Sequence, residues 1–168
     1  MEKIQAVNQL HHQGEAILSI CAPVSEEQAR WKPDPENWSI LETLNHLLLE
    51  ERLDFRNHLG HIFYKGQSIP PEIAPKNEKE RSLEPRLLAE ILLEFKAERE
   101  TSIAWLNALH EPDWGARISF EWGTLSAGDL LASWLAHDLL HLRQLVSLQY
   151  HLTAKENQPF EVDYAGKW

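Results

Sequence analysis

The sequence predicts an all-α fold, a four-helix bundle with long crossover loops. Four long stretches repeat apolar residues at the three- and four-residue spacing of an amphipathic helix. The stretches between them are rich in proline or charge, and at least one is too long for a tight turn. Because 168 residues is an ordinary length for one domain, we expect residues 1–168 to form a single helical-bundle domain.

The repeated apolar spacing predicts helices over residues 3–21, 39–64, 82–110 and 126–151. A proline-rich connection over 23–38 follows the first helix, with room for one helical turn at 26–30. The second and fourth helices begin at Ser39 and Ser126 with capping boxes. In a capping box, the serine and an acidic residue three positions later satisfy each other's free backbone N–H groups.

The remaining stretches are predicted to be connections and a tail. Residues 66–82 are charged and proline-rich, and a connection of that length usually forms a crossover or a functional lid. Residues 118–122 alternate in polarity and fit a short extended piece, although one piece does not make a sheet. Residues 152–168 are expected to pack along the bundle as an extended tail, because a free tail would expose large aromatic side chains.

The composition argues against several classes of partner. Asp and Glu number 26 against 16 Lys and Arg, for a formal net charge of -10, and no basic cluster is visible. We therefore expect neither nucleic acid nor an anionic membrane as a partner. No apolar run approaches the roughly 20 residues of a membrane span, and the N-terminal stretch resembles neither a signal nor a transit peptide. These features, with a single cysteine, favour a cytoplasmic location.

The lone cysteine, Cys21, excludes an intramolecular disulfide. It stands at the apolar end of the first predicted helix. This position favours a small core residue over a reactive thiol.

The strongest chemical signal is a pair of histidines in the fourth predicted helix, His137 and His141. Residues four apart share one helix face, and Trp134 and Leu145 continue the same apolar row. Neutral imidazole is a good ligand for zinc, nickel, copper or ferrous iron, so the pair favours a metal site. His46, flanked by leucines on the second helix, is the candidate third ligand. Three histidines leave coordination positions open, which indicates catalysis or substrate binding.

Other interpretations of these residues remain open at the level of sequence. Interior histidines bonded to carbonyls or carboxylates would need no metal. The stretch His137-Asp138-x-x-His141 resembles the H-E-x-x-H helix of zinc peptidases with Asp in place of Glu, but no strand edge is apparent to align a peptide. A di-iron carboxylate site is disfavoured because the paired Glu-x-x-His motifs are missing.

Two motifs surround these histidines: Trp38-Ser39-x-x-Glu42-x-x-x-His46-Leu47 and His137-Asp138-x-x-His141-x-x-Gln144. Three further stretches accompany them: Arg30-Trp31-Lys32-Pro33, Glu51-Arg52-x-Asp54-Phe55-Arg56 and Trp122-Gly123-x-Leu125. Together they resemble the DinB superfamily of bacterial four-helix-bundle metal proteins over most of the chain. The resemblance implies one divalent transition metal, zinc or nickel first and iron as a further option, held by His46, His137 and His141.

The resemblance also draws attention to residues around the ligands. Many members carry a carboxylate three residues after the first histidine, where this sequence has Leu49, so we expect no acidic ligand there. Three residues are expected to support the ligands or a bound water: Glu50, Asp138 and Gln144. Three tryptophans are expected at a pocket: Trp38, Trp122 and Trp134.

Several activities are implied by the family, among them thiol S-transfer with bacillithiol or mycothiol, mycothiol-dependent isomerisation, and hydrolysis. All use a metal that lowers the pKa of a bound water or thiol. We therefore expect a metal-dependent hydrolase or a low-molecular-weight-thiol S-transferase acting on a small molecule, without assigning a catalytic residue. A non-catalytic metal-binding or stress-response protein is the alternative, and tryptophans sealing the metal would favour it. The family often forms dimers, so a homodimer is a further expectation.

Overall fold

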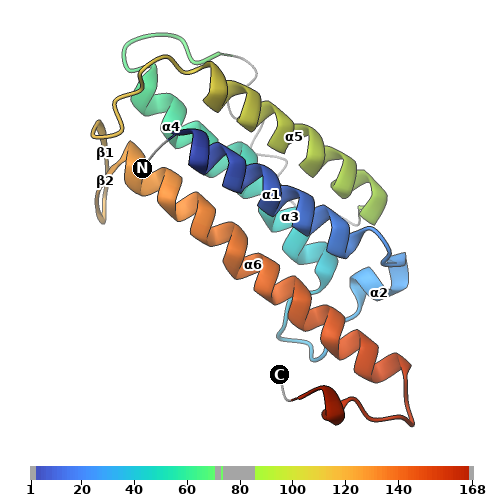
Figure 1. Cartoon of the computed structure of the whole chain (residues 1–168). Coiled ribbons are helices and arrows are strands. Elements are labelled where there is room, and N and C mark those ends of the chain that lie inside the picture. Colours follow the sequence, from blue (N-terminus) through green and yellow to red (C-terminus); the bar gives the residue numbers. More distant parts are fainter. Residues whose placement is uncertain (1–2, 71–72, 74–85, 167–168) are drawn as a thin grey trace.

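Four helical rods make up the body of the computed structural model, which describes residues 3–70, 73 and 86–166 (Figure 1). The rods are α1 (Lys3–Cys21), the continuous run of α3 (Ile40–Glu50), η1 (Glu51–Phe55) and α4 (Arg56–Phe63), then α5 (Leu88–Ala108) and α6 (Ala127–Glu156). Short helices lie outside the rods: α2 (Glu26–Arg30) and η3 (Asp163–Ala165). The predicted all-α bundle is confirmed. The start of the third predicted helix, residues 82–85, lies outside the described residues.

The order of the rods around the bundle brings α3 beside α6. Helix α1 packs against α5 and α6, and α3 packs against the same two helices, so α1 and α3 are diagonally opposed. In Figure 1, α1 and α6 run in one direction, while α3, α4 and α5 run in the other. Because α4 and α5 point the same way, the end of α4 and the start of α5 lie at opposite ends of the bundle (Figure 1). The two helices are therefore joined by a crossover, as the sequence predicted, although residues 71–72 and 74–85 of the connection lie outside the described residues.

The predicted capping boxes begin the two helices that carry the histidines. The Ser39 N–H donates to Glu42 Oε2 at 2.7 Å, and the Glu42 N–H donates to Ser39 Oγ at 3.2 Å. Ser126 and Asp129 form the same pair at the start of α6. The helical turn predicted at 26–30 is also present, and its Glu26 Oε1 accepts a hydrogen bond from the Leu88 N–H at 2.6 Å. Helix α2 thereby satisfies a free N–H at the start of α5.

The second rod contains a π-helical turn, η1, between α3 and α4. Such a turn holds one residue more than an α-helical turn, and it rotates all the following side chains by about 100° around the helix. One regular helix was predicted over residues 39–64, without this turn. No proline or glycine marks the insertion over Glu51–Phe55, so nothing in the local sequence signalled it.

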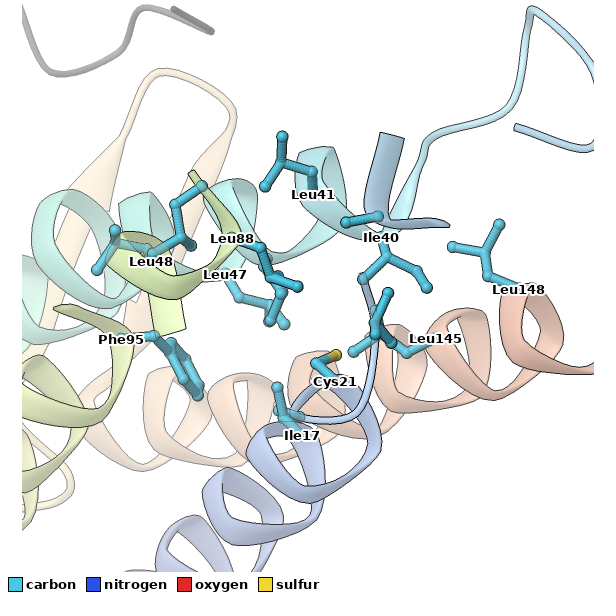
Figure 2. Packing of buried hydrophobic residues seen from close by; sticks show 14 of the residues in the cluster. Ile17, Cys21, Ile40, Leu41, Leu47, Leu48, Leu88, Phe95, Leu145 and Leu148 are labelled. Carbon is cyan, nitrogen blue, oxygen red and sulfur yellow. The ribbon is translucent and has the colours of Figure 1, made fainter. Parts of the chain in front are cut away.

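The apolar core is divided into two clusters along the bundle. Figure 2 shows one of them, in which Cys21 packs among Ile17, Leu145 and other aliphatic side chains. Cys21 is buried, which confirms the prediction of a core residue, and burial raises the pKa of its thiol to about 12. The second cluster gathers around Leu10, Leu59 and Trp134.

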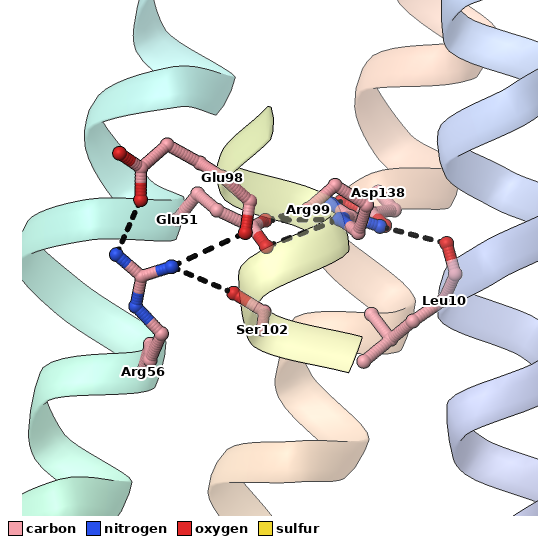
Figure 3. Close-up of polar contacts among 7 residues, drawn as sticks. All are labelled: Leu10, Glu51, Arg56, Glu98, Arg99, Ser102 and Asp138. Atoms are coloured by element: carbon pink, nitrogen blue, oxygen red, sulfur yellow. Dashed lines mark hydrogen bonds and ion pairs between the residues drawn. The ribbon is translucent and has the colours of Figure 1, made fainter. Parts of the chain in front are cut away.

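A layer of buried charge lies among these helices (Figure 3). Arg99 of α5 pairs with Glu51 of η1, Nη2 to Oε2 at 2.9 Å, and with Asp138 of α6, Nη1 to Oδ2 at 2.6 Å. Its Nη1 also donates to the Leu10 carbonyl of α1 at 2.9 Å. Gly14 makes room for this side chain, because a Cβ there would lie 3.1 Å from Arg99 Cγ. One arginine thus connects all four rods.

A small hairpin links α5 to α6. Strands β1 (Arg117–Phe120) and β2 (Gly123–Ser126) pair antiparallel, with Ile118 opposite Leu125. The extended piece predicted at 118–122 overlaps the first strand. Its partner was not predicted, because Gly123–Ser126 contains one large apolar residue, Leu125, and shows no alternation.

The C-terminal stretch differs from the prediction of an extended tail over 152–168. Helix α6 continues to Glu156, because Leu152 is buried and extends the apolar face of the helix beyond His151. Beyond the helix, Phe160 and Tyr164 are exposed, so these two rings do not pack on the bundle. Among the described residues, none of the helices has the length and apolar character needed to span a bilayer.

Candidate metal centre

The structure brings the three predicted ligands together between α3 and α6. The Nε2 atom of His137 lies 3.1 Å from His46 Nε2 and 3.2 Å from His141 Nε2. One ligand atom from each ring falls within 4.8 Å of the others, and all three side chains are half-buried. The i, i+4 spacing stacks two of the rings on α6, and the packing of α3 against α6 supplies the third.

Hydrogen bonds alone do not account for this convergence. An imidazole nitrogen carries either one hydrogen or one in-plane lone pair. The Nε2 of His137 therefore cannot form good hydrogen bonds to both His46 and His141. Two nitrogens bound to one zinc ion at about 2.0–2.1 Å would lie about 2.8–3.4 Å apart, from right-angled to tetrahedral geometry. The observed 3.1 and 3.2 Å fit a shared cation.

Polar side chains lie on the far side of two of the rings from the cluster, and one of them forms a hydrogen bond that orients its ring. His141 Nδ1 donates to Gln144 Oε1 at 2.9 Å, because an amide oxygen can only accept. This bond places the hydrogen of a neutral His141 on Nδ1 and leaves the Nε2 lone pair free for a metal. Glu50 Oε1 lies 3.8 Å from His46 Nδ1, on the corresponding side of the other ring.

The electrostatic surroundings favour the neutral, ligand-competent form of the rings. Burial, followed by the neighbouring His141 imidazole, lowers the pKa of both His46 and His137 to about 4. The carboxylate of Asp54 acts in the opposite direction on both rings without reversing the shift. At neutral pH both rings are therefore uncharged, and each carries a lone pair on one of its nitrogens.

Asp138 does not lie with the ligands, although the sequence analysis grouped it with them. Its carboxylate is buried against the Arg99 guanidinium, with contacts at 2.6 and 3.1 Å (Figure 3). The reason is helical geometry, since the residue after His137 lies about 100° around the helix. The peptidase interpretation needs this acid beside the metal, so the structure argues against it.

Only one of the three tryptophans predicted at a pocket lies against the histidines and lines a groove. The Trp38 ring meets His46 edge-on at 5.0 Å between centroids and lies parallel to His141 at 6.2 Å. Trp134 is 1% exposed and stacks on Phe55 within the core. Trp122 is 72% exposed and stacks on Phe120 of the hairpin, and it belongs to the lining of neither groove at the histidines.

Two grooves open at the histidine cluster. The larger, of about 700 Å³, runs along α6 and includes Trp38, His141 and Gln144 in its lining. The smaller, of about 500 Å³, includes His46 and Glu50. The cluster is therefore accessible rather than sealed by the tryptophans.

The π-helical turn shapes the smaller groove. Its lining includes His46, Glu50, Asp54 and His58, which follow one another at four-residue steps. In a regular α-helix each such step drifts by about 40°, so the first and last of these residues would diverge by about 120°. The extra residue of η1 offsets most of that drift. Asp54 and His58 are thereby kept on the side of the rod that carries His46.

Asp54 and His58, which the π-helical turn keeps in this groove, form a carboxylate–imidazole pair. His58 Nδ1 lies 3.1 Å from Asp54 Oδ1, and the carboxylate oxygen accepts this bond. Neither residue was predicted to be part of the site. The only sequence signal for them was their spacing at four-residue steps after His46. A regular helix would not have kept residues at this spacing on one face.

Comparison with protein families agrees with the fold and the histidine cluster. The family model described as the DinB superfamily matches residues 9–145, which include all three histidines. The chain belongs to the DinB superfamily. No curated protein shows significant similarity to the sequence. Membership in the DinB superfamily and the three-histidine cluster together fit a metal-binding protein.

Proposed function

We propose that this DinB superfamily protein is a divalent-metal-dependent enzyme, either a hydrolase or a low-molecular-weight-thiol S-transferase. The observation that carries the proposal is the position of the histidine cluster, since His141 lines one groove and His46 lines another. A bound divalent ion would act as a Lewis acid that lowers the pKa of a water or thiol. Zinc and nickel suit three imidazole ligands, and ferrous iron is a further candidate.

The residues around the cluster divide into ligands and supporting groups. His46, His137 and His141 would hold the ion through Nε2. Gln144 orients the His141 ring through its hydrogen bond, and the neighbouring Trp38 indole shields one side of the cluster from water.

The carboxylate–imidazole pair supplies a candidate proton carrier. Because Asp54 accepts the hydrogen on His58 Nδ1, the other ring nitrogen, Nε2, is left as a proton acceptor. The pair lines the same groove as His46, so a substrate in that groove would meet both the metal ligands and a base. A general base of this kind supports an enzyme over a non-catalytic metal-binding protein.

Elemental analysis of protein purified without a histidine tag tests the metal site. The variant His137→Ala/His141→Ala removes two ligands, and His11→Ala/His12→Ala is the matched control because both of its histidines are exposed. We expect about one equivalent of transition metal in the wild type and the control, and none in the ligand variant, with helical circular dichroism retained in all three. Wild-type protein that takes up neither zinc, nickel nor iron would contradict the proposal.

Turnover is tested separately with the metal-loaded protein. Ester and amide panels report hydrolysis, and a chromogenic electrophile offered with and without bacillithiol, mycothiol or cysteine reports thiol transfer. We expect one of the two reactions to depend on the bound metal and to be lost in His137→Ala/His141→Ala. A fully loaded protein that is inactive in both panels would favour the non-catalytic alternative.

A further inference from the structure

The two grooves at the histidine cluster differ in charge. The larger groove is lined by Arg143 and His151 with the neutral polar residues Asn37, Gln144 and Ser147, and none of its described lining residues is acidic. The smaller groove contains both Glu50 and Asp54 and, among its described lining residues, neither lysine nor arginine. In a protein of net charge -10, a concave surface with an arginine and no carboxylate is unusual.

The arginine of the larger groove has no acidic partner among the described residues. Most of the other described arginines form an ion pair with an acidic side chain, as Arg99 does with Glu51 and Asp138. Arg143 is exposed on α6 and forms no ion pair within the described part of the chain. Its guanidinium is therefore free to pair with an anion from solution, with the forked geometry that suits carboxylate and phosphate.

The groove is long as well as charged. His141, Gln144, Ser147 and His151 follow one side of α6 and all line it. At 1.5 Å per residue, the distance along the helix from His141 to His151 is about 15 Å. Trp38 adds an aromatic wall at the His141 end, parallel to that imidazole. A volume of about 700 Å³ suits a small organic molecule rather than a single ion.

We propose that this groove binds an elongated, anionic small molecule, with its reacting end at the histidine cluster and its carboxylate or phosphate paired with Arg143. The inference rests on the proposed function in that it names the class of substrate for the same site. Arg143 pairs with the charge, and the apolar body of the molecule crosses the groove between His141 and Arg143, against Trp38.

Binding of ω-mercapto acids to the zinc-loaded protein tests the proposal by calorimetry. The thiol provides a metal-binding end, and 8-mercaptooctanoate places a carboxylate about 10 Å from it, within the length of the groove. The neutral comparison is 8-mercapto-1-octanol, which has the same chain without the charge. We expect the wild type to bind the acid about tenfold more tightly than the alcohol.

Arg143→Gln should bring the two affinities to within about twofold of each other, since the pairing group is lost. Lys96→Gln, which removes an exposed charge on α5, is the control and should preserve the preference. Circular dichroism of both variants verifies the fold. A wild type that binds acid and alcohol equally, or an Arg143→Gln protein that keeps the preference, would overturn the proposal.

A second arm separates this proposal from the metal site itself. Octanoate, 1-octanol and octyl phosphate are titrated into metal-free protein, so that no metal contributes to binding. An anion preference that disappears in Arg143→Gln supports the groove assignment even if the protein takes up no metal. Whichever of octanoate and octyl phosphate binds more tightly identifies the anionic group, carboxylate or phosphate, that the groove prefers. Equal, Arg143-independent binding of all three would contradict the anionic groove whatever the metal content.

Discussion

Gln144 Oε1 accepts a hydrogen bond from His141 Nδ1 at 2.9 Å, and His141 Nε2 faces the Nε2 of His137 at 3.2 Å. The two contacts lie on opposite sides of one imidazole ring. The amide therefore sets both the direction of the ring and the position of its hydrogen. It links a groove residue to the metal-binding nitrogen without touching the metal position.

Gln144→Leu should weaken metal binding by about 10–100-fold, because the ring loses the acceptor that fixes its tautomer. Gln144→Glu should retain most of the affinity, since a carboxylate can accept the same hydrogen. Competition with a chromogenic zinc chelator measures both. Equal affinities for the wild type and Gln144→Leu would show that the hydrogen bond does not orient the ligand.

Metal-free protein should lose stability as the pH falls from about 6.5 toward 4. The folded-state pKa of His46 and of His137 is about 4, below the ordinary value of 6.5. Between these pH values the unfolded chain binds more protons than the folded protein, so acid favours unfolding. The contribution of the two neutral histidines to stability is fully present above pH 6.5 and is lost as the pH falls toward 4. Urea midpoints at several pH values should fall less steeply in His46→Gln/His137→Gln than in His11→Gln/His12→Gln. Equal slopes in the two variants would contradict the assignment.

Arg99→Met should lower the free energy of unfolding by about 3–5 kcal/mol at pH 7, because it leaves the buried carboxylates of Glu51 and Asp138 without a partner. The triple variant Arg99→Met/Glu51→Gln/Asp138→Asn should recover part of the loss, since it removes the uncompensated charge. Urea denaturation measures each variant, and Arg117→Met, at an exposed arginine, is the control. A loss below about 1 kcal/mol for the single variant would show that this pairing contributes little to stability.

Cys21 should be inert toward thiol reagents while the protein is folded. Its pKa is raised to about 12 by burial, whereas a free thiol titrates near 8.5, and the thiolate is the reactive form. Labelling with a disulfide reagent at pH 8 should proceed no faster than unfolding and should become rapid in denaturing urea. Fast labelling of the folded protein would show that the cluster in Figure 2 opens locally.

The features that the sequence predicted correctly are those with a local or periodic signal. Capping boxes mark the start of α3 and α6, and the apolar row around His137 and His141 gives their common face. His46 was found because leucines flank it. The bundle and the approach of these three histidines follow from such signals together with the family resemblance.

The features that were missed depend on partners far away in the chain. Asp138 stands next to His137 in the sequence, but its direction is set by Arg99, 39 residues away on another helix. Helix α6 extends past its predicted end because Leu152 finds apolar neighbours, including residues of α2 and its flanks. Pairings of this kind leave no periodic trace. Only the assembled bundle reveals them.

The π-helical turn has a consequence for changes in chain length. Deleting one residue within Glu51–Phe55 would restore a regular α-helix and rotate everything after it by about 100°. His58 would then leave the groove that His46 lines, and so would the residue at the position of Asp54. Leu59 would turn away from the core. A substitution in this turn changes one side chain. The deletion of a single codon would instead separate the Asp54–His58 pair from the candidate metal ligand His46.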